Sequence, residues 1–236
     1  MKIIIKKIFG LIGIEIKRIP SISKHIAFLH ISKTAGTQIM YVANQLNDYG
    51  VNIKKYHHSI KLADIPSNTK FFFSIRNPAT RFVSGFYSRK KKNDHTPHEK
   101  KAFENFNHAN DVAENLFSEN VIGEHAHHAI KSISHNSMQQ IDWLQRKFNF
   151  ELQPPITIIR QEHFKQDMQR FLNLLNVDLE ISNLITEDKI IAHKNDYDNV
   201  PPLSGKALTN LKKWYVQDYE FYRMCERWLK IKNHIN

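Results

Sequence analysis

The sequence has one cysteine, Cys225, and only seven glycines in 236 residues. A single cysteine excludes an internal disulfide and a cysteine-based zinc site, and it is compatible with a reducing compartment, so a cytoplasmic location is expected. Neither a disulfide nor a structural metal is required, because 41% of the residues are hydrophobic and fifteen residues are Phe. A chain of this length and composition can bury a core of its own.

The sequence also lacks a long uninterrupted hydrophobic run. Residues 1–20 mix Ile, Leu and Phe with Lys and Arg, which interrupts the apolar positions too early for a membrane span. The segment has neither the unbroken apolar core nor the small-residue cleavage site of a secretory signal. Two interpretations stay open: a basic amphipathic segment on the anionic inner face of a membrane, and a helix packed on its own domain. Residues 21–236 are expected to form one domain.

Acidic residues are in the minority, and the formal net charge is +11. Such a protein attracts polyanions, which include nucleic acid, anionic lipid, acidic glycans and highly charged nucleotides. A nucleic-acid binder interleaves basic residues with exposed aromatic residues, whereas Phe71–Phe73 has the character of a buried strand. Nucleic acid is therefore not the expected partner, although a non-catalytic basic nucleic-acid-binding protein stays as an alternative.

Three segments have the pattern of a buried strand followed by a loop and a helix. The strands are expected at residues 26–30, 70–75 and 155–159, and the helices follow after residue 37 and from about residues 79 and 162. Strands that alternate with helices predict an α/β fold with a mainly parallel central sheet flanked by helices, a three-layer sandwich of P-loop-like type. Residues 99–148 and 204–229 have helical patterns and are expected to cover a site at the carboxyl edge of the sheet.

The loop after the first expected strand reads Ser-Lys-Thr-Ala-Gly-Thr at residues 32–37. Main-chain N–H groups and the positive end of the helix dipole can hold phosphate there, Gly36 lets the main chain approach, and Lys33 and the hydroxyls add donors. A Walker A motif places its Lys after the second Gly, whereas Lys33 precedes the only Gly of this loop. No expected strand ends in a magnesium-binding Asp, which favours metal-free transfer. A P-loop nucleotide kinase that uses ATP and magnesium stays as an alternative.

The loop after the second expected strand begins at Arg76, and Ser84 follows eight residues later, two turns along the next helix. A guanidinium and a hydroxyl in these positions suit a second anionic group, since the planar fork of Arg donates two parallel bonds to phosphate. Pro78 suits the first turn of that helix. The two loops therefore predict two anion sites on neighbouring strand-to-helix junctions.

Together, Lys-Thr-Ala-Gly-Thr at 33–37 and Arg-Asn-Pro-x-x-Arg-x-x-Ser-Gly-Phe at 76–86 resemble the two nucleotide-binding motifs of the sulfotransferases that use 3'-phosphoadenosine 5'-phosphosulfate. The more similar branch contains carbohydrate (heparan-type) enzymes and their bacterial relatives. Looser similarity extends to residues 158–164 and 214–222. The resemblance implies that the first motif contacts the 5'-phosphosulfate and the second the 3'-phosphate. The residues that would contact the nucleotide are Lys33, Thr34, Ala35, Gly36, Thr37, Arg76 and Ser84.

The same resemblance implies that the sulfuryl group passes to a hydroxyl of an acceptor, with adenosine 3',5'-bisphosphate as the product and no metal. The expected acceptor is a carbohydrate or a lipid-linked glycan. Such a transfer requires alignment of donor and acceptor and stabilisation of the charge on the leaving oxygen. Lys33 is the candidate for this role, as a hydrogen-bond donor to the bridging oxygen. A related protein that binds the nucleotide without turnover is a further alternative.

A histidine is the expected base for the attacking hydroxyl, because the ordinary pKa of histidine lies near neutrality. Tyr56-His57-His58 ends an expected strand between the two loops, and the residues after it are similar to the segment in which glycan-modifying relatives place a histidine base. His58 is the candidate and His57 the alternative. The acceptor is expected to contact His57, Arg81 and His135.

A further group of titratable residues lies in one expected helix: Glu124, His125, His127 and His128. Neighbouring residues of a helix point in different directions, and no fourth ligand is evident. We therefore predict no metal site, and we expect these residues to form a solvated or acceptor-facing helix surface.

Overall fold

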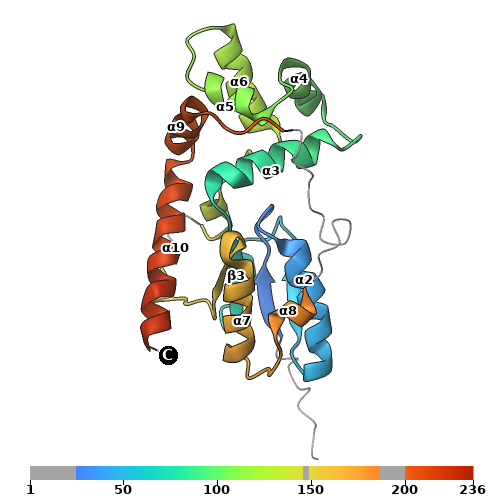
Figure 1. Cartoon of the computed structure of the whole chain (residues 1–236), viewed down its shortest axis with the longest axis vertical. Coiled ribbons are helices and arrows are strands. Elements are labelled where there is room, and N and C mark those ends of the chain that lie inside the picture. The colour runs from blue at the N-terminus through green and yellow to red at the C-terminus, as the bar shows by residue number, and fades with distance from the viewer. Residues whose placement is uncertain (1–24, 146–148, 186–199, 236) are drawn as a thin grey trace, which may run out of the picture.

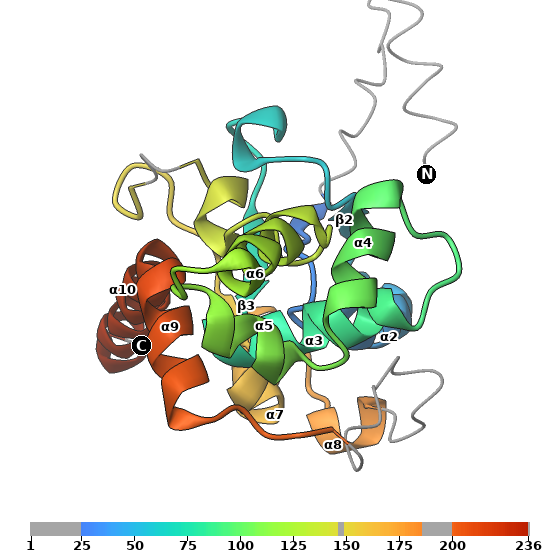
Figure 2. The same cartoon turned by 90° about the horizontal axis from the view of Figure 1, so that it is seen from above.

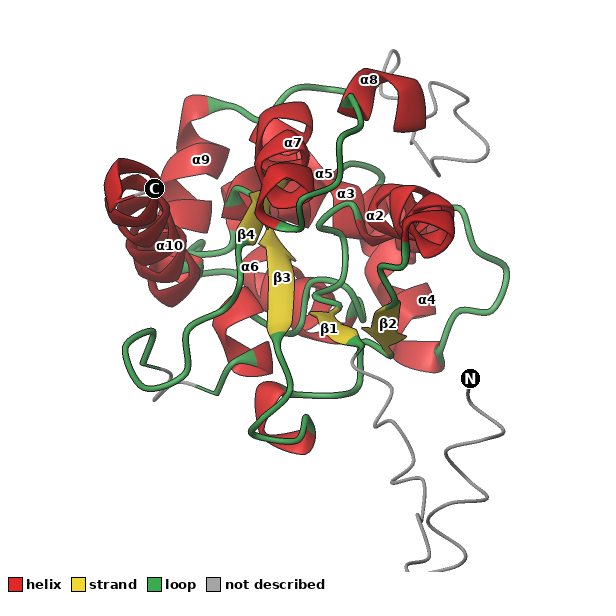
Figure 3. Cartoon of the chain, turned by 90° about the horizontal axis from the view of Figure 1, so that it is seen from below, coloured by secondary structure: helices red, strands yellow, loops and turns green. Residues whose placement is uncertain are grey.

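The computed structural model describes residues 25–145, 149–185 and 200–235, and within them four parallel strands form one sheet in the order β2-β1-β3-β4. The strands are β1 (Ile26–Leu29), β2 (Ile53–Tyr56), β3 (Phe71–Ile75) and β4 (Ile158–Arg160). Figure 3 shows the four strands side by side, with helices on both sides of the sheet. Because the strands are parallel, their carboxyl ends lie at one edge, where open α/β sheets bind ligands.

The centre of the sheet is apolar on both faces. All five residues of β3 are buried, and the Cα register pairs its Phe73 with Leu29 of β1. Successive side chains of a strand point to opposite faces, so Phe72 packs on one side and Phe71 and Phe73 on the other. The ring of Phe28 stacks on that of Phe72 with 5.0 Å between centroids. Burial on both faces is why β3 reads as a continuous hydrophobic run.

The face of the sheet that carries Phe72 is covered by α2 (Gly36–Gln45), η1 (Leu46–Tyr49), α7 (Phe164–Leu174) and α8 (Ile181–Leu184). The strand β4 enters α7 through η4 (Gln161–His163). Ile39 and Val42 on α2 are three residues apart and share the stripe that faces the sheet. From α7, the ring of Phe171 lies 4.6 Å from that of Phe72. These contacts fix the start of α2 at the end of β1.

The opposite face is covered by α10 (Val216–Ile235), η2 (Leu62–Asp64) and η3 (Gln140–Trp143). On α10, Phe221, Cys225 and Leu229 are buried and four residues apart, as expected for the apolar stripe of a helix. The ring of Phe221 stacks on that of Phe73 with 6.0 Å between centroids. Burial raises the pKa of the Cys225 thiol, so this cysteine is a packing residue and not a nucleophile.

A separate layer of helices lies at one end of the sheet (Figure 1), and Figure 2 shows the same layer from above. Its helices are α3 (Pro78–Lys90), α4 (Pro97–Asn105), α5 (Ala109–Asn115), α6 (Val121–Ser132) and α9 (Gly205–Trp214). They share a core of their own that includes Phe86, Ile130 and Leu211. The side chains of Thr96 and Ser204 cap α4 and α9, which determines where these helices begin.

The structure confirms the expected α/β fold with a parallel sheet and flanking helices. The strands expected at 26–30, 70–75 and 155–159 are β1, β3 and β4, and the tail contains two helices, α9 and α10. The interpretation of residues 1–20 lies outside the described residues. No helix in the described part of the chain is both long and apolar enough to cross a bilayer.

Candidate active site

The first strand-to-helix junction lies between β1 and α2. Lys33 and Ala35 have left-handed main-chain conformations, with φ of 67° and 69°. Ala35 is the N-cap residue of α2, no side chain caps this helix, and its first turn contains no acidic residue. The first N–H groups of a helix have no partner within the helix. The junction therefore has the geometry of an anion site, in which main-chain N–H groups and the helix dipole act together.

Gly36 opens α2 and lies against the ring of His30. A Cβ atom on residue 36 would stand 2.2 Å from Nε2 of His30, which is far inside contact distance. A larger residue at position 36 would therefore require the His30 ring to move, and glycine also leaves the main chain open to a ligand. Sequence reasoning did not identify His30 as a site residue. Its position directly before the phosphate loop was the signal that could have found it.

Thr34 ties the loop to the sheet. Its side chain is buried, and its hydroxyl donates to the carbonyl of Ile31 at 2.8 Å. Its Oγ1 also lies 2.7 Å from Oγ of Ser74 on β3. This hydroxyl was expected to face the phosphate, and the structure directs it into the core instead. The main chain of Thr34 remains part of the loop. Thr37, in the first turn of α2, is exposed.

Arg81 lies beneath the first loop with only 2% of its surface exposed. Its Nε donates to the carbonyl of Ser32 at 3.0 Å and its Nη2 to the hydroxyl of Ser32 at 3.1 Å. Its Nη1 donates to the carbonyl of Met138 at 2.9 Å, and the guanidinium lies over the ring of Trp143, 5.6 Å from the centroid. The structure contradicts the expectation that Arg81 contacts the acceptor. A side chain this buried, with these partners, positions the loop.

Asp218 on α10 balances the buried charge of Arg81. Burial raises the pKa of Asp218, and the charge of Arg81 opposes that rise. The carboxylate accepts hydrogen bonds from the N–H groups of Gln140 and Ile141 at 2.8 and 3.1 Å. Asp218 thus joins α10 to the start of η3, and Arg81 holds the first loop. The attraction between their opposite charges links these three segments.

Lys33 is a partly buried cation among other cations. Burial is the largest cause of a fall in its pKa from 10.5 to about 8. The charges of Arg76, Lys92 and Arg81 contribute to that fall. Cations held this close repel one another unless an anion lies between them. The arrangement is therefore suited to a strongly anionic ligand.

The second junction, between β3 and α3, caps its own helix. Oδ1 of Asn77 accepts a hydrogen bond from the N–H of Ala79 at 3.0 Å, and Pro78 occupies the first turn as expected. The main chain of Arg76 pairs with the amide of Gln140: its N–H donates at 2.9 Å and its carbonyl accepts at 2.8 Å. Because the protein satisfies these main-chain groups, the second junction offers side chains to a ligand.

Those side chains lie along one face of α3. Nε of Arg76 donates to Oγ1 of Thr80 at 3.0 Å, which places the guanidinium over the first turn. Thr80 and Ser84 are four residues apart and are therefore neighbours on the helix surface. Ser84 is only 4% exposed. The structure thus brings Arg76 and Ser84 to one face and adds Thr80, which its spacing from Ser84 could have revealed.

Glu162, in the turn after β4, connects the second junction with the terminal helix. Its Oε1 accepts hydrogen bonds from the N–H of Asn77 at 2.8 Å and from the hydroxyl of Thr80 at 3.3 Å. Its Oε2 accepts one from the hydroxyl of Tyr222 on α10 at 3.1 Å. One carboxylate therefore fixes the start of α3 from two segments that are remote in sequence.

His57 and His58 follow β2 directly, and both are exposed. The ring of His58 lies edge-on to that of His30 beside the first loop, with 6.2 Å between centroids. The main-chain carbonyl of His58 accepts a hydrogen bond from Nε1 of Trp143 at 2.7 Å. The ring of His57 lies 3.9 Å from that of His58, and its Nδ1 is 2.8 Å from the hydroxyl of Ser59. His58 is the member of the pair whose ring faces His30.

Three histidines of this region, His30, His58 and His135, have lowered pKa values. Burial lowers the pKa of His30 to about 3, with a contribution from Lys55. Burial lowers the pKa of His135 to about 4, with contributions from cations that include Lys33. Burial is also the first cause of a lowered pKa at His58. A neutral imidazole can accept a proton, as a general base must.

Buried polar atoms without a hydrogen-bond partner gather around these residues. Within the described residues they belong to His30, Gln38, Asn136, Gln139 and His128. Gln38 is in the first turn of α2, and Asn136 and Gln139 share a segment with His135. Of these residues only His128, which lies on α6 and faces α4, is apart from the site. Because buried polar groups in native proteins are normally paired, this concentration favours a ligand site here.

An open groove of about 500 Å³ lies near the segment that follows β2. Its lining residues are Lys61, Met138, Asp142 and Gln145. Two contacts described above connect it with the site: Arg81 holds the carbonyl of Met138, and Trp143, next to Asp142, holds the carbonyl of His58. The groove is therefore connected with the site through the segment 138–145, which contacts both Arg81 and the main chain of His58.

The histidine-rich helix α6 differs from the expected solvated surface. Nε2 of His127 hydrogen-bonds to the carbonyl of Leu116, and Nε2 of His128 lies 3.4 Å from Nδ1 of His98 on α4. For His127 and His128 the expectation is wrong, since these side chains take part in packing between helices. Among residues 25–145, 149–185 and 200–235, no group of three or more His, Cys, Asp or Glu side chains is placed to hold a metal.

A main-chain anion site with a desolvated lysine lies next to an arginine-bearing helix face, both at the carboxyl edge of a parallel sheet. This combination is typical of α/β proteins that bind phosphorylated ligands. The model of the Sulfotransferase family matches residues 21–223, which is most of the chain. The chain therefore belongs to the sulfotransferase family. It has no significant match among curated proteins or among solved structures.

Proposed function

We propose that this protein transfers the sulfuryl group of 3'-phosphoadenosine 5'-phosphosulfate to a hydroxyl of a glycan, and that the donor spans both junctions. The observation that carries the proposal is the convergence of charge, because Arg76 of the second junction contributes to the lowered pKa of Lys33 in the first. A nucleotide with anionic groups at both ends of its ribose neutralises both cations. Sulfotransferases generally use this donor.

Each junction binds one end of the donor in this proposal. The N–H groups at the start of α2, with Lys33 and Thr37, bind the 5'-phosphosulfate. Arg76, Thr80 and Ser84 bind the 3'-phosphate, for which a guanidinium and hydroxyls on one helix face are suitable donors. Arg81 takes no direct part and holds the first loop in place.

The reaction forms a bond between the acceptor oxygen and sulfur and breaks the bond between sulfur and the bridging oxygen of the donor. Lys33 donates a hydrogen bond to that bridging oxygen and stabilises the negative charge that develops on it. Neutral His58 accepts the proton of the acceptor hydroxyl and later releases it to solvent. The products are a sulfated acceptor and adenosine 3',5'-bisphosphate.

The acceptor occupies the groove near the segment that follows β2 and reaches His58, with His57 and His135 as further contacts. The groove has a cationic donor, a carboxylate and an amide around an apolar methionine, which is the mixture of polar and apolar groups that a polyhydroxylated ligand requires. A carbohydrate or lipid-linked glycan is the acceptor class we propose. A cytoplasmic location with peripheral membrane contact through residues 1–20 completes the proposal.

Nucleotide preference tests the proposal. Adenosine 3',5'-bisphosphate should raise the melting temperature, since a ligand at 100 times its dissociation constant stabilises the folded state by about 2.7 kcal/mol. ATP with magnesium should raise it much less, because ATP has no 3'-phosphate for Arg76. Equal or greater stabilisation by ATP with magnesium, together with ATP hydrolysis, would favour the kinase alternative and contradict the proposal.

The base assignment has its own test. His58→Ala should lower turnover on a polysaccharide acceptor about 100-fold, within the range of general-base contributions, and leave the affinity for adenosine 3',5'-bisphosphate unchanged. His57→Ala is the matched control, because it removes the neighbouring imidazole. Transfer of radiolabelled sulfate measures both. A large loss in His57→Ala with normal turnover in His58→Ala would assign the base to His57.

A further inference from the structure

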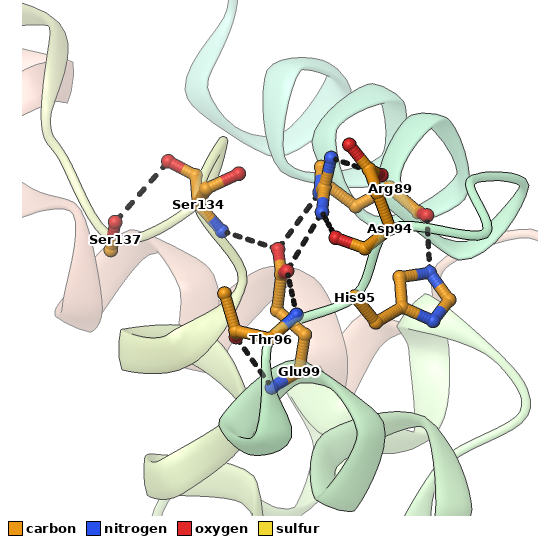
Figure 4. Close-up of polar contacts among 7 residues, drawn as sticks. All are labelled: Arg89, Asp94, His95, Thr96, Glu99, Ser134 and Ser137. Atoms are coloured by element: carbon orange, nitrogen blue, oxygen red, sulfur yellow. Dashed lines mark hydrogen bonds and ion pairs between the residues drawn. The ribbon is translucent and has the colours of Figure 1, made fainter.

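Glu99, in the first turn of α4, is a buried carboxylate of the helical layer. Its side chain is 1% exposed, and Arg89 at the end of α3 binds it with both ends of the guanidinium fork. Nε of Arg89 donates to Oε1 and Nη2 donates to Oε2, each at 2.8 Å. Figure 4 shows this pair at the centre of a set of polar contacts that join several segments.

Two main-chain groups complete the contacts of Glu99. The N–H of Thr96, at the N-cap of α4, donates to Oε2 at 3.1 Å. The N–H of Ser134, in the segment after α6, donates to Oε1 at 3.2 Å. The carboxylate thus joins the end of α3, the start of α4 and the segment that follows α6 (Figure 4).

Glu99 remains ionised across the working pH range. Burial raises its pKa, but the hydrogen bonds from Arg89, Thr96 and Ser134 outweigh burial and lower the pKa to about 2. A buried ion pair often adds little net stability over a well-packed apolar pair. The pair also holds a particular segment in place, because Ser134, which Glu99 binds, is followed by His135.

His135 is held between two anchored residues. On one side, Ser134 is bound by Glu99. On the other, the carbonyl of Asn136 accepts a hydrogen bond from the hydroxyl of Tyr215 at 2.9 Å. The segment also packs tightly on α3, where a Cβ atom on Gly85 would stand 3.2 Å from Cβ of His135. These contacts hold the main chain on both sides of His135 and place its Cβ atom against α3.

The place where His135 is held is the proposed active site. The charge of Lys33 contributes to the low pKa of His135, after burial, and Arg81, Arg89 and His58 contribute as well. From this geometry we infer that Glu99 is a positioning residue: by binding Ser134 it fixes the main chain at His135 against α3, and with it the place of the His135 ring in the proposed site. The inference rests on the proposed function for the role of the site, but not for the placement of the ring.

The substitution Glu99→Gln tests the placement, with Asp167→Asn as a matched control. Asp167 is also 1% exposed and binds both ends of a guanidinium fork, that of Arg160, at 2.9 and 2.8 Å. The exposed fractions of Arg89 and Arg160 are 13% and 14%. Both substitutions therefore remove one charge from equivalent buried pairs, and only one of the pairs contacts the segment of His135.

The readout is the titration of the His135 ring, followed by NMR of isotope-labelled histidine and assigned by the signal lost in His135→Asn. Removing the negative charge of Glu99 acts electrostatically to lower the pKa of His135 still further. A ring released into water gains a proton more easily, so its pKa rises toward 6.5. The sign of the change thus separates positioning from electrostatics.

We expect the pKa of His135 to rise from about 4 toward 6.5 in Glu99→Gln, a more than tenfold gain in proton affinity, and to stay unchanged in Asp167→Asn. An unchanged or lower pKa in Glu99→Gln overturns the inference, and so does an equal rise in both variants. If Glu99→Gln does not fold, Ser134→Pro decides instead, since it removes the N–H that Glu99 binds and leaves the Glu99–Arg89 pair in place, and the same rise is expected.

The affinity for adenosine 3',5'-bisphosphate, measured by calorimetry, separates this inference from the proposed function. It should change less than twofold in Glu99→Gln, because Lys33 and Arg76 keep their contacts. If the unmodified protein does not bind the bisphosphate, the proposed function fails, while the titration still decides where His135 is held. If the bisphosphate binds and His135 titrates as before in Glu99→Gln, the positioning role alone fails.

Discussion

The two strand-to-helix junctions lie on adjacent strands and yet are built in opposite ways. The first leaves α2 without a side-chain cap and bends the main chain into left-handed conformations at Lys33 and Ala35. The second caps α3 with Asn77 and pairs the main chain of Arg76 with a buried glutamine. One junction therefore offers main-chain N–H groups and a lysine to an anion, and the other offers a guanidinium and hydroxyls.

The difference indicates how one ligand can be held and activated at once. Main-chain N–H groups and a desolvated lysine surround the end of the donor at which a bond breaks, where preorganised donors have the largest effect on rate. A guanidinium with hydroxyls gives strong, directional binding at the end that does not react. We therefore expect substitutions at the first junction to affect turnover and those at the second to affect affinity.

The largest effect should follow from Lys33→Ala. Loss of the donor to the leaving oxygen should reduce the turnover number about 1,000-fold, at the upper end of the effect of removing one such donor. The fold should persist, because Lys33 lies in a loop and belongs to none of the hydrophobic core clusters. Lys70→Ala is the matched control for loss of one lysine, because Lys70 directly precedes β3, at the edge of the sheet away from the two junctions. Retained turnover in a folded Lys33→Ala protein, measured with labelled donor, would remove Lys33 from the mechanism.

The second largest effect should follow from Arg76→Ala. A hydrogen-bonded charge of this kind contributes about 1.5–3 kcal/mol, so the dissociation constant for adenosine 3',5'-bisphosphate should rise about 10- to 100-fold. The turnover number at saturating donor should change much less. Calorimetry measures the affinity, and Arg223→Ala on α10 provides the control. An unchanged dissociation constant would exclude the 3'-phosphate contact.

The pH dependence of binding sharpens the comparison further. Lys33 has a pKa of about 8 in the folded protein, against 10.5 for an ordinary lysine. Above pH 8 the free protein loses this proton, so the affinity for the bisphosphate should fall, by up to about tenfold per pH unit. The free energy of unfolding should rise between pH 8 and 10.5, because the unfolded chain still binds the proton there. Calorimetric titration with the bisphosphate across this pH range should find no such fall in affinity in Lys33→Ala. A fall in affinity that persists in this variant would mean that another group titrates.

The smallest effect should follow from Asn77→Ala. Loss of the cap should lower the free energy of unfolding by about 1 kcal/mol, which thermal denaturation can measure. The affinity for the bisphosphate should stay within a few-fold of its normal value, since the N–H groups of α3 are not the proposed anion site. Asn77→Asp should restore stability. A large loss of affinity in Asn77→Ala would mean that the second junction also binds through its main chain.

Much of the fold could be predicted from the sequence, because local patterns determine it. The run Phe71–Phe73 is buried on both faces, and Pro78 fits the first turn of α3. Strand β2 was less evident, since Lys54 and Lys55 expose its centre at the edge of the sheet. Edge strands have one exposed side and a weaker hydrophobic signal.

The site was less predictable, because burial depends on contacts between remote segments. Thr34 and Arg81 belong to the phosphate motifs, yet their polar atoms bind Ser74 and Met138, 40 and 57 residues away. The motif alone cannot distinguish a residue that contacts the ligand from one that supports the loop. The pairing of Ser134 with Glu99, 35 residues apart, has no local sequence signal either.

The central claim is that one nucleotide bridges the two junctions, and a crystal structure with adenosine 3',5'-bisphosphate tests it most directly. We predict that the 5'-phosphate lies against the start of α2 within hydrogen-bond distance of Lys33, and that the 3'-phosphate lies against Arg76 and Ser84. A nucleotide that contacts only one of these junctions, with the other facing a different surface, would contradict the account.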